Sequence, residues 1–448
     1  MEELQQLAIY VVESAMKSGA TAADCVIQEG NEFSTTIRCD EVEQLKEAGA
    51  KSLGLRVFLG HRTASTYTSD FSHQGIERLV ASALAAARVT SEDPCAGLPE
   101  PEVVGQYPED LNLFSEDVTH LEAHAMMELA RRAEKAAFAF DPRIQNSEGG
   151  SFDATYGRKI LATSQGFLGA YRRSSCSLSV VPIAAGTQGM QRDYWYSISR
   201  SLAGLEPPEE IGRKAAERTV RRLDARKVPT CKVPVVFDQR TGRSILASLF
   251  EALSGESIYR RASFLAGKLG EQVASAAVTL FDDATLKGGF GSLPFDDEGV
   301  RTGRTVVIER GVLKSYLMNC YTARKLGLKT TGNAGRGVAG NPGVRPANFF
   351  LEPGPKSPEE IIRSVKNGFY VTEFLGFGFN AVTGDLSHGA AGIWIVNGEL
   401  AYPVQEVTIA GNLLEMLQAI TQVGSDLEFR GAVASPTFQI AEMTVAGQ

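Results

Sequence analysis

The sequence predicts an α+β fold of more than one domain, in which helices flank long antiparallel strands. The chain has 448 residues, and at about 150 residues per domain this length favours two or three domains. β-Prone stretches with alternating polar residues recur along the chain, and many glycines, 45 in all, mark turns between them. These turns and long strands argue against a helical bundle. Stretches with the apolar spacing of amphipathic helices lie between the strands.

Residues 1–90 are predicted to form an N-terminal α+β domain. An apolar stripe with helical spacing predicts a first helix over residues 2–19, which Gly19 ends as a C-terminal cap. Short strands follow, and a hairpin turn through residues 60–62 joins the last two of them. A second helix is expected over residues 75–89, on the same apolar spacing.

Residues 91–116 contain four prolines and predict a linker or a surface crossing. A middle α+β domain is expected over residues 117–228. It opens with a helix over 118–137, continues with long β-prone stretches and closes with a charged helix. Pro207 and Pro208 suit the first turn of that last helix, because proline lacks the amide hydrogen that a first turn leaves unpaired.

Residues 229–448 are predicted to form a β-rich C-terminal domain. It starts with a buried strand followed by a helix over 241–254, and the segment 304–317 has the pattern of a hairpin. Later in this domain, Ser357 and Glu360 have the S-x-x-E spacing of a capping box, which predicts the start of another helix.

Composition excludes several classes of protein. The net charge of −8 argues against binding to nucleic acid or to a membrane surface, because both need clustered Lys and Arg. The acidic first residues are not typical of a signal peptide, and no apolar run approaches the about 20 residues that span a bilayer. Six scattered cysteines without a C-x-x-C pair predict reduced thiols. We therefore expect a cytoplasmic protein.

Residues 335–340 match G-x-G-x-x-G, the fingerprint of dinucleotide binding. That site requires a helix to open within the motif, so that the pyrophosphate meets the helix N-terminus. Here Asn341, Pro342 and Gly343 follow and cannot open a helix. A flexible Gly-rich loop is the favoured interpretation.

Two other groups of residues could hold a metal. His120 and His124 are one helical turn apart on the predicted helix, but a closed zinc site needs further ligands. An acidic cluster, Asp282, Asp283 and 296–298, could hold a hard cation or act as paired carboxylates. Aspartate is also common at strand and turn ends, so we favour a structural role for the cluster.

A family resemblance becomes visible in the C-terminal part of the chain. It is carried by the segments LFEALSGES, LAGKLGEQVAS, VTLFDDATL, GSLPFDDEGVRTGRTVVIERGVLKSYL, TTGN and SPEEIIRSVKNGFYV. Their residues and order resemble the TldD/PmbA family, from about residue 20 to the C-terminus. Members are known as modulators of DNA gyrase and as subunits of a bacterial peptidase. The resemblance implies a TldD/PmbA-like α+β fold.

The resemblance also points to one branch of that family. TldD-like members carry H-E-x-x-x-H on a helix and a later cysteine, and these residues bind catalytic zinc. In this chain Phe250 and Gly255 occupy the histidine positions and only Glu251 is retained. The late cysteine is expected near 431–435, but Cys320 is the last cysteine of the chain. The chain therefore resembles the PmbA/TldE branch, with no catalytic residue and no metal ligand of its own.

What the resemblance implies is a heterodimer with a TldD-type subunit that carries the zinc, although self-association is the alternative. Short or unfolded peptides are the implied substrates. Tyr194, Trp195 and Tyr196 lie in a β-prone segment and could contact such a peptide, or they could be an ordinary core or sheet face. A peptide could bind by strand addition to an exposed sheet edge.

Three other hypotheses stay open at this point. The chain could be a homodimeric peptide- or protein-binding adaptor without catalysis. It could be a hydrolase with a relocated site, at the acidic cluster or at His120 and His124. It could also contact a basic DNA-binding partner, which the acidic net charge permits but does not specify.

Overall fold

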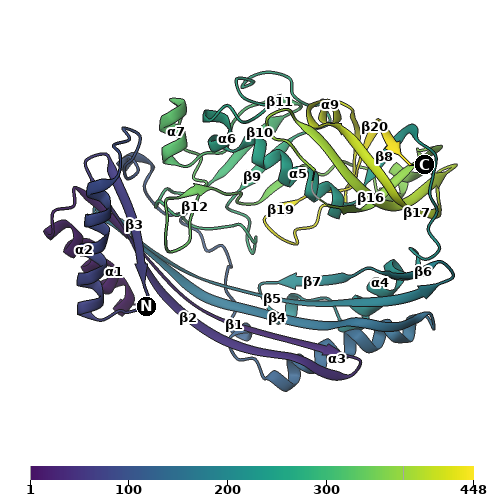
Figure 1. Ribbon diagram of the computed structural model, residues 1–448, viewed down its shortest axis with the longest axis horizontal. Coiled ribbons are helices and arrows are strands. Elements are labelled where there is room, and N and C mark those ends of the chain that lie inside the picture. Colours follow the sequence, from purple (N-terminus) through teal and green to yellow (C-terminus); the bar gives the residue numbers. More distant parts are fainter. Residues whose placement is uncertain (1, 377, 448) are drawn as a thin grey trace.

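One long curved sheet forms one side of the molecule, and three smaller sheets with their helices form the other side (Figure 1). The computed structural model describes residues 2–376 and 378–447. The predicted α+β class, with long antiparallel strands and flanking helices, is confirmed. Among the described residues, no helix combines the length and the apolar character needed to cross a bilayer.

The long sheet begins in the N-terminal part of the chain. Its first elements are α1 (Glu2–Lys17), β1 (Ala22–Arg38), β2 (Glu41–Leu59), β3 (Arg62–Thr68) and α2 (His73–Val89). The two helices bury their apolar faces on one face of the sheet, and Ile27 of β1 is part of that core. The predicted hairpin at residues 60–62 is confirmed.

The next elements extend the same sheet rather than starting a new one. They are η1 (Pro101–Val103), η2 (Glu116–Val118), α3 (Ala123–Phe140), β4 (Ile144–Thr163), β5 (Leu168–Gly186), β6 (Gly189–Arg192), β7 (Trp195–Ser199), η3 (Leu202–Gly204) and α4 (Pro208–Val220). β1 pairs antiparallel with β4 from Asp24 to Ile37. The strand order is β3-β2-β1-β4-β5-β6, with β7 also on β5. The predicted N-terminal and middle domains thus share one sheet.

The histidine pair does not lie on one helix. α3 begins at Ala123, so His124 is in its first turn while His120 lies three residues before the helix. The sequence-based prediction that both rings share one helical face is wrong. The physical reason is that the segment before Ala123 forms a short 3-10 turn at Glu116–Val118 and then an irregular stretch.

The C-terminal part contains two larger sheets around a central helix and a two-stranded sheet of β12 and β13. Its elements are β8 (Cys231–Phe237), α5 (Gln239–Leu253), α6 (Gly255–Tyr259), β9 (Leu280–Asp283), β10 (Arg304–Glu309), β11 (Val312–Leu313), α7 (Cys320–Leu326), β12 (Ala334–Gly335), β13 (Gly343–Val344), β14 (Phe349–Leu351), α8 (Pro358–Arg363), β15 (Asn367–Leu375), β16 (Asp385–Val396), β17 (Glu399–Asn412), α9 (Leu413–Gln418), β18 (Ile420–Val423), β19 (Val433–Ala434) and β20 (Phe438–Ala446). One sheet has the order β11-β10-β9-β14-β19. The other runs β17-β16-β15-β8-β20-β18 and closes on itself through a β17–β20 pairing.

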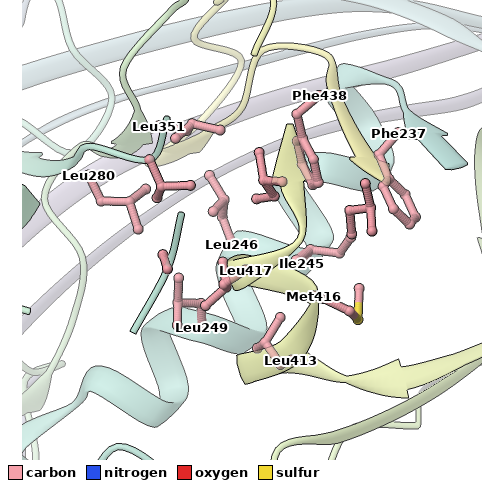
Figure 2. Close-up of a cluster of buried hydrophobic side chains, with 14 of the residues drawn as sticks. Phe237, Ile245, Leu246, Leu249, Leu280, Leu351, Leu413, Met416, Leu417 and Phe438 are labelled. Carbon is pink, nitrogen blue, oxygen red and sulfur yellow. The ribbon is translucent and has the colours of Figure 1, made fainter. Parts of the chain in front are cut away.

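The largest core of the molecule lies between these two sheets (Figure 2). Leu246 and Leu249 of α5 point into it, together with Leu280 of β9, Phe237 of β8 and Leu417 of α9. α5 is therefore held on several sides, and this packing fixes where its last turn and the following α6 lie. These are the elements that carry the degenerate zinc positions.

Candidate functional site

The last turn of α5 is apolar where the family resemblance places a zinc-binding histidine. Asp238 caps the start of this helix, because its carboxylate accepts a hydrogen bond of 2.8 Å from the Thr241 amide. At the other end, the ring of Phe250 packs edge-on against Phe349 of β14, with ring centres 5.7 Å apart. An aromatic pair occupies this position, and neither side chain can coordinate a metal.

The second position has no room for any side chain. Gly255 is buried at the start of α6. A Cβ atom there would lie 2.7 Å from Oγ1 of Thr322 and 2.8 Å from Cγ of Met318, in and next to α7. These distances are shorter than van der Waals contact, so α7 fills the space in which a histidine ring would stand.

Glu251, the retained position, faces solvent. Its carboxylate makes no hydrogen bond and no ion pair with the described residues, and only its backbone oxygen accepts a bond, from Ser254 at 3.4 Å. The carboxylate therefore does not tie the helix to the following loop.

The segment in which the late cysteine was expected does lie beside α5. Val433 of β19 pairs in parallel with Phe349, the ring partner of Phe250. Ser435 is buried, and a Cβ on Gly242 of α5 would lie 2.5 Å from its Oγ. Phe349 thus joins Phe250 to the segment 431–435, and that segment contains no cysteine. Among the described residues, no three His, Cys, Asp or Glu side chains are grouped so that they could hold a metal ion.

The predicted aromatic contact residues line a cavity of about 260 Å³ between β7 and the C-terminal part. The guanidinium of Arg240 lies 4.1 Å from the ring centre of Tyr194, and that of Arg430 lies 4.2 Å from the ring centre of Trp195. Arg430 also donates to the backbone oxygen of Tyr196. The three aromatic residues therefore hold two parts of the molecule together. Tyr194 remains 37% exposed, so peptide contact stays a prediction for it.

The aspartates of the acidic cluster hold the surrounding loops in place through hydrogen bonds. Asp282 accepts hydrogen bonds from Nδ2 of Asn333 at 2.6 Å and from the Ala347 amide at 2.9 Å. Asp296 accepts bonds from three backbone amides, those of Glu298, Val300 and Ala334. Burial raises the pKa of Asp282 to about 7. Burial, with the neighbouring Glu298 charge, raises the pKa of Asp296 to about 8.

A buried ionic network, which sequence reasoning missed, joins the sheet to the Gly-rich loop. Asp24 of β1 binds Arg56 of β2, with Nη2 and Oδ2 2.6 Å apart, and also accepts a bond from Arg336 of the loop. Both arginines and Asp24 are almost fully buried. The only signal in the sequence is charge on otherwise apolar strands. The Gly-rich loop over 335–340 is confirmed, since no helix opens there.

A polar cavity of about 430 Å³ adjoins this network and α6. Its walls include the buried side chains of Arg56, Glu298 and Asn319, while Thr322, which excludes a side chain at Gly255, lines it too. Such walls can hydrogen-bond polar groups of either charge. The cavity lies next to the degenerate zinc position.

Comparisons with known proteins agree with this architecture. Three family models match consecutive parts of the chain: PmbA/TldA metallopeptidase domain 1 over residues 23–87, the central domain over 116–223 and the C-terminal domain over 230–447. The chain is 40% identical over 427 residues to Metalloprotease PmbA of Escherichia coli O157:H7, covering 95% of this chain and 92% of that protein. It is 35% identical over 447 residues to a Metalloprotease PmbA homolog of Haemophilus influenzae, covering 100% and 96%.

Solved structures share the fold over the whole length. A candidate modulator of DNA gyrase from Bacteroides thetaiotaomicron superposes with a TM-score of 0.92 at 28% identity, covering 100% of both chains. TldE from Thermococcus kodakarensis gives 0.88 at 21% identity, covering 98% of this chain and 100% of that one, and this likeness shows the fold alone. On these matches, which span nearly all of its length, the chain belongs to the PmbA/TldD metallopeptidase family.

Proposed function

We propose that this chain is a PmbA/TldE-like subunit of a cytosolic zinc metallopeptidase complex that degrades or processes peptides, and that it carries no zinc itself. The observation that carries the proposal is the packing at the two histidine positions. Phe250 packs edge-on against Phe349, and the space at Gly255 is filled by Thr322 and Met318. A zinc ion does not fit these residues, and they cannot hold a metal for a catalytic step.

The zinc would be supplied by a TldD-type partner. Relatives at 40% and 35% identity are named metalloproteases, which supports peptide hydrolysis as the activity of the assembly. A relative named Metalloprotease TldD homolog, from Buchnera aphidicola, is 26% identical over 392 residues, which supports a partner of related architecture. The polar cavity beside α6 would then form part of a shared peptide-binding surface.

Peptide cleavage tests this proposal. The chain is assayed alone, with a TldD-type subunit, and with the same subunit carrying His→Ala at its first zinc position. We expect no cleavage alone, cleavage on mixing, and none with the zinc-site variant. Cleavage by the chain alone would contradict the proposal. Absence of any complex on size-exclusion chromatography, with this chain self-associated, would favour the homodimeric adaptor instead.

A further inference from the structure

A row with no side chain larger than a methyl group, called the bare row below, crosses three strands of the long sheet. The register pairs Ala50 of β2 with Gly30 of β1, Gly30 with Gly157 of β4, and Gly157 with Arg173 of β5. Neighbouring rows carry full side chains, such as Gln28 beside Lys159. A Cβ at Gly157 would lie 2.3 Å from the backbone oxygen of Glu29, so the backbone geometry keeps this row bare.

This row lies on the face that looks toward the C-terminal part. Side chains alternate along a strand, so residues two apart share a face. Lys159, two residues from Gly157, donates to Asp297 at 2.6 Å, and Tyr171, two residues from Arg173, packs on Phe295 with ring centres 5.4 Å apart. A groove of about 550 Å³ follows the bare row, and Arg200 and Phe290 also line it.

The groove is open at one end and walled at the other. At β2, no described strand pairs with the outer edge of residues 41–52, because β3 pairs only with 53–59. At β5, Arg200 donates to the backbone oxygens of Gly288 and Gly289, and its guanidinium lies 5.0 Å from the Phe290 ring centre. These bonds fix the wall and the position of the guanidinium.

Two cations at the walled end lack a counter-ion. Arg173 and Arg200 have no ion pair within the described residues. Burial and the neighbouring Arg173 lower the pKa of Arg200 to about 10, so the two positive charges repel each other. The carboxylates that line the groove already have counter-ions, since Glu29 pairs with Arg158 and Glu32 pairs with Lys46. An anion between the two arginines would relieve this repulsion.

We propose that the groove binds the last residues of an extended peptide, with the C-terminal carboxylate between Arg173 and Arg200. Three strand spacings separate Ala50 from Arg173, about 14 Å, and an extended tetrapeptide spans about 13 Å. The walled end favours a chain terminus over an acidic side chain within a longer peptide. Two free cations on a chain of net charge −8 do not suffice for nucleic acid. This inference rests on the proposed function, which brings peptides to this face.

Binding of a labelled peptide tests the inference directly. A neutral hexapeptide with a fluorophore at its amino end is made as the free acid and as the C-terminal amide, and its affinity for the full chain is measured by fluorescence anisotropy. We expect the acid to bind at least about tenfold more tightly than the amide, since hydrogen bonds to charged groups have that magnitude. Arg173→Gln should remove the difference.

The neighbouring Arg172 offers a matched control. It lies on the opposite face, where it pairs with Glu116 at 2.8 Å and stacks on Phe114 at 3.5 Å. Arg172→Gln should leave the acid-to-amide ratio unchanged. Ala50→Phe should weaken both peptides by filling the open end, whereas Glu47→Phe, on the other face of β2, should not. Equal affinity for acid and amide, or equal effects of the two arginine variants, would overturn the inference.

This assay needs neither a partner nor catalysis, so the two proposals fail separately. If acid and amide bind equally well but the mixed subunits cleave peptides, only the carboxylate site is contradicted. If the acid binds more tightly but mixing gives no cleavage, only the peptidase-subunit proposal is contradicted.

Discussion

The Nζ atom of Lys159 in β4 donates a hydrogen bond of 2.6 Å to Oδ1 of Asp297, and both side chains are buried between the long sheet and the C-terminal part. Lys159 also donates to the backbone oxygen of Arg336, whose amide donates to Oδ2 of Asp297 at 2.7 Å. Two segments far apart in the sequence are thereby fixed to each other. This is the same face that carries the bare row and the arginine pair.

Removing one partner of this pair should be costly. Lys159→Met leaves the Asp297 carboxylate buried without its cation, and we expect the free energy of unfolding to fall by about 3 kcal/mol. Urea denaturation measures this change. Lys46→Met, which breaks a solvent-exposed pair with Glu32, is the control and should cost less than about 1 kcal/mol. Equal losses in the two variants would show that the buried pair does not join the two parts.

Stability should fall as the pH rises through the range in which Asp282 ionises. The pKa of this carboxyl is raised to about 7 by burial, against about 3.9 for an unfolded aspartate. The folded chain holds a proton that the unfolded chain releases, so this stabilisation is complete below about pH 4 and is lost by about pH 7.

Asp282→Asn should therefore flatten the decline in unfolding free energy between about pH 5 and pH 7, whatever its effect on absolute stability. The exposed Asp110→Asn variant serves as control. A parallel pH dependence for wild type and Asp282→Asn would contradict the raised pKa.

The close packing at the degenerate zinc position should be measurable. Gly255→Ala places a Cβ against Thr322 and Met318, and we expect a loss of about 1–3 kcal/mol from overpacking. Gly303, which has open space where a Cβ would be, is the control, and Gly303→Ala should be close to neutral. Thermal unfolding of both variants decides the matter. A neutral Gly255→Ala would mean that a side chain fits there after all.

Tyr194 is the most exposed of the three predicted aromatic contact residues, at 37%, and it lines the cavity beside β7. Tyr194→Ala should weaken peptide binding by about fivefold, as expected for an exposed aromatic contact. Tyr67→Ala removes a tyrosine that is 61% exposed on β3, outside that cavity, and should not affect binding. Identical dissociation constants for the two variants would remove Tyr194 from the binding surface.

Local signals in the sequence predicted many single elements. The spacing of Ser357 and Glu360 predicted a capping box, and both of its reciprocal hydrogen bonds are present at the start of α8. Gly19 ends the first helical segment with a φ of 101°. Such signals work because the caps and turns depend on residues only a few positions apart.

The same local signals could not predict features that depend on residues far apart in the sequence. The short strands predicted after the first helix were wrong in length, because Gly30 and Gly49 lie inside strands of 17 and 19 residues. Asp24 pairs with Arg336, which is 312 residues away, and no local pattern in the sequence identifies that partner. The helical spacing of His120 and His124 gave a wrong site because propensity could not locate the start of α3 at Ala123.

The zinc content of the purified chain tests the central claim most directly. Inductively coupled plasma mass spectrometry is applied to this chain alone and to its complex with a TldD-type subunit. We expect no stoichiometric zinc in the chain alone and one zinc per heterodimer in the complex, because Phe250 and Gly255 leave no ligand at the helix positions. One equivalent of tightly held zinc in the chain alone would contradict this expectation.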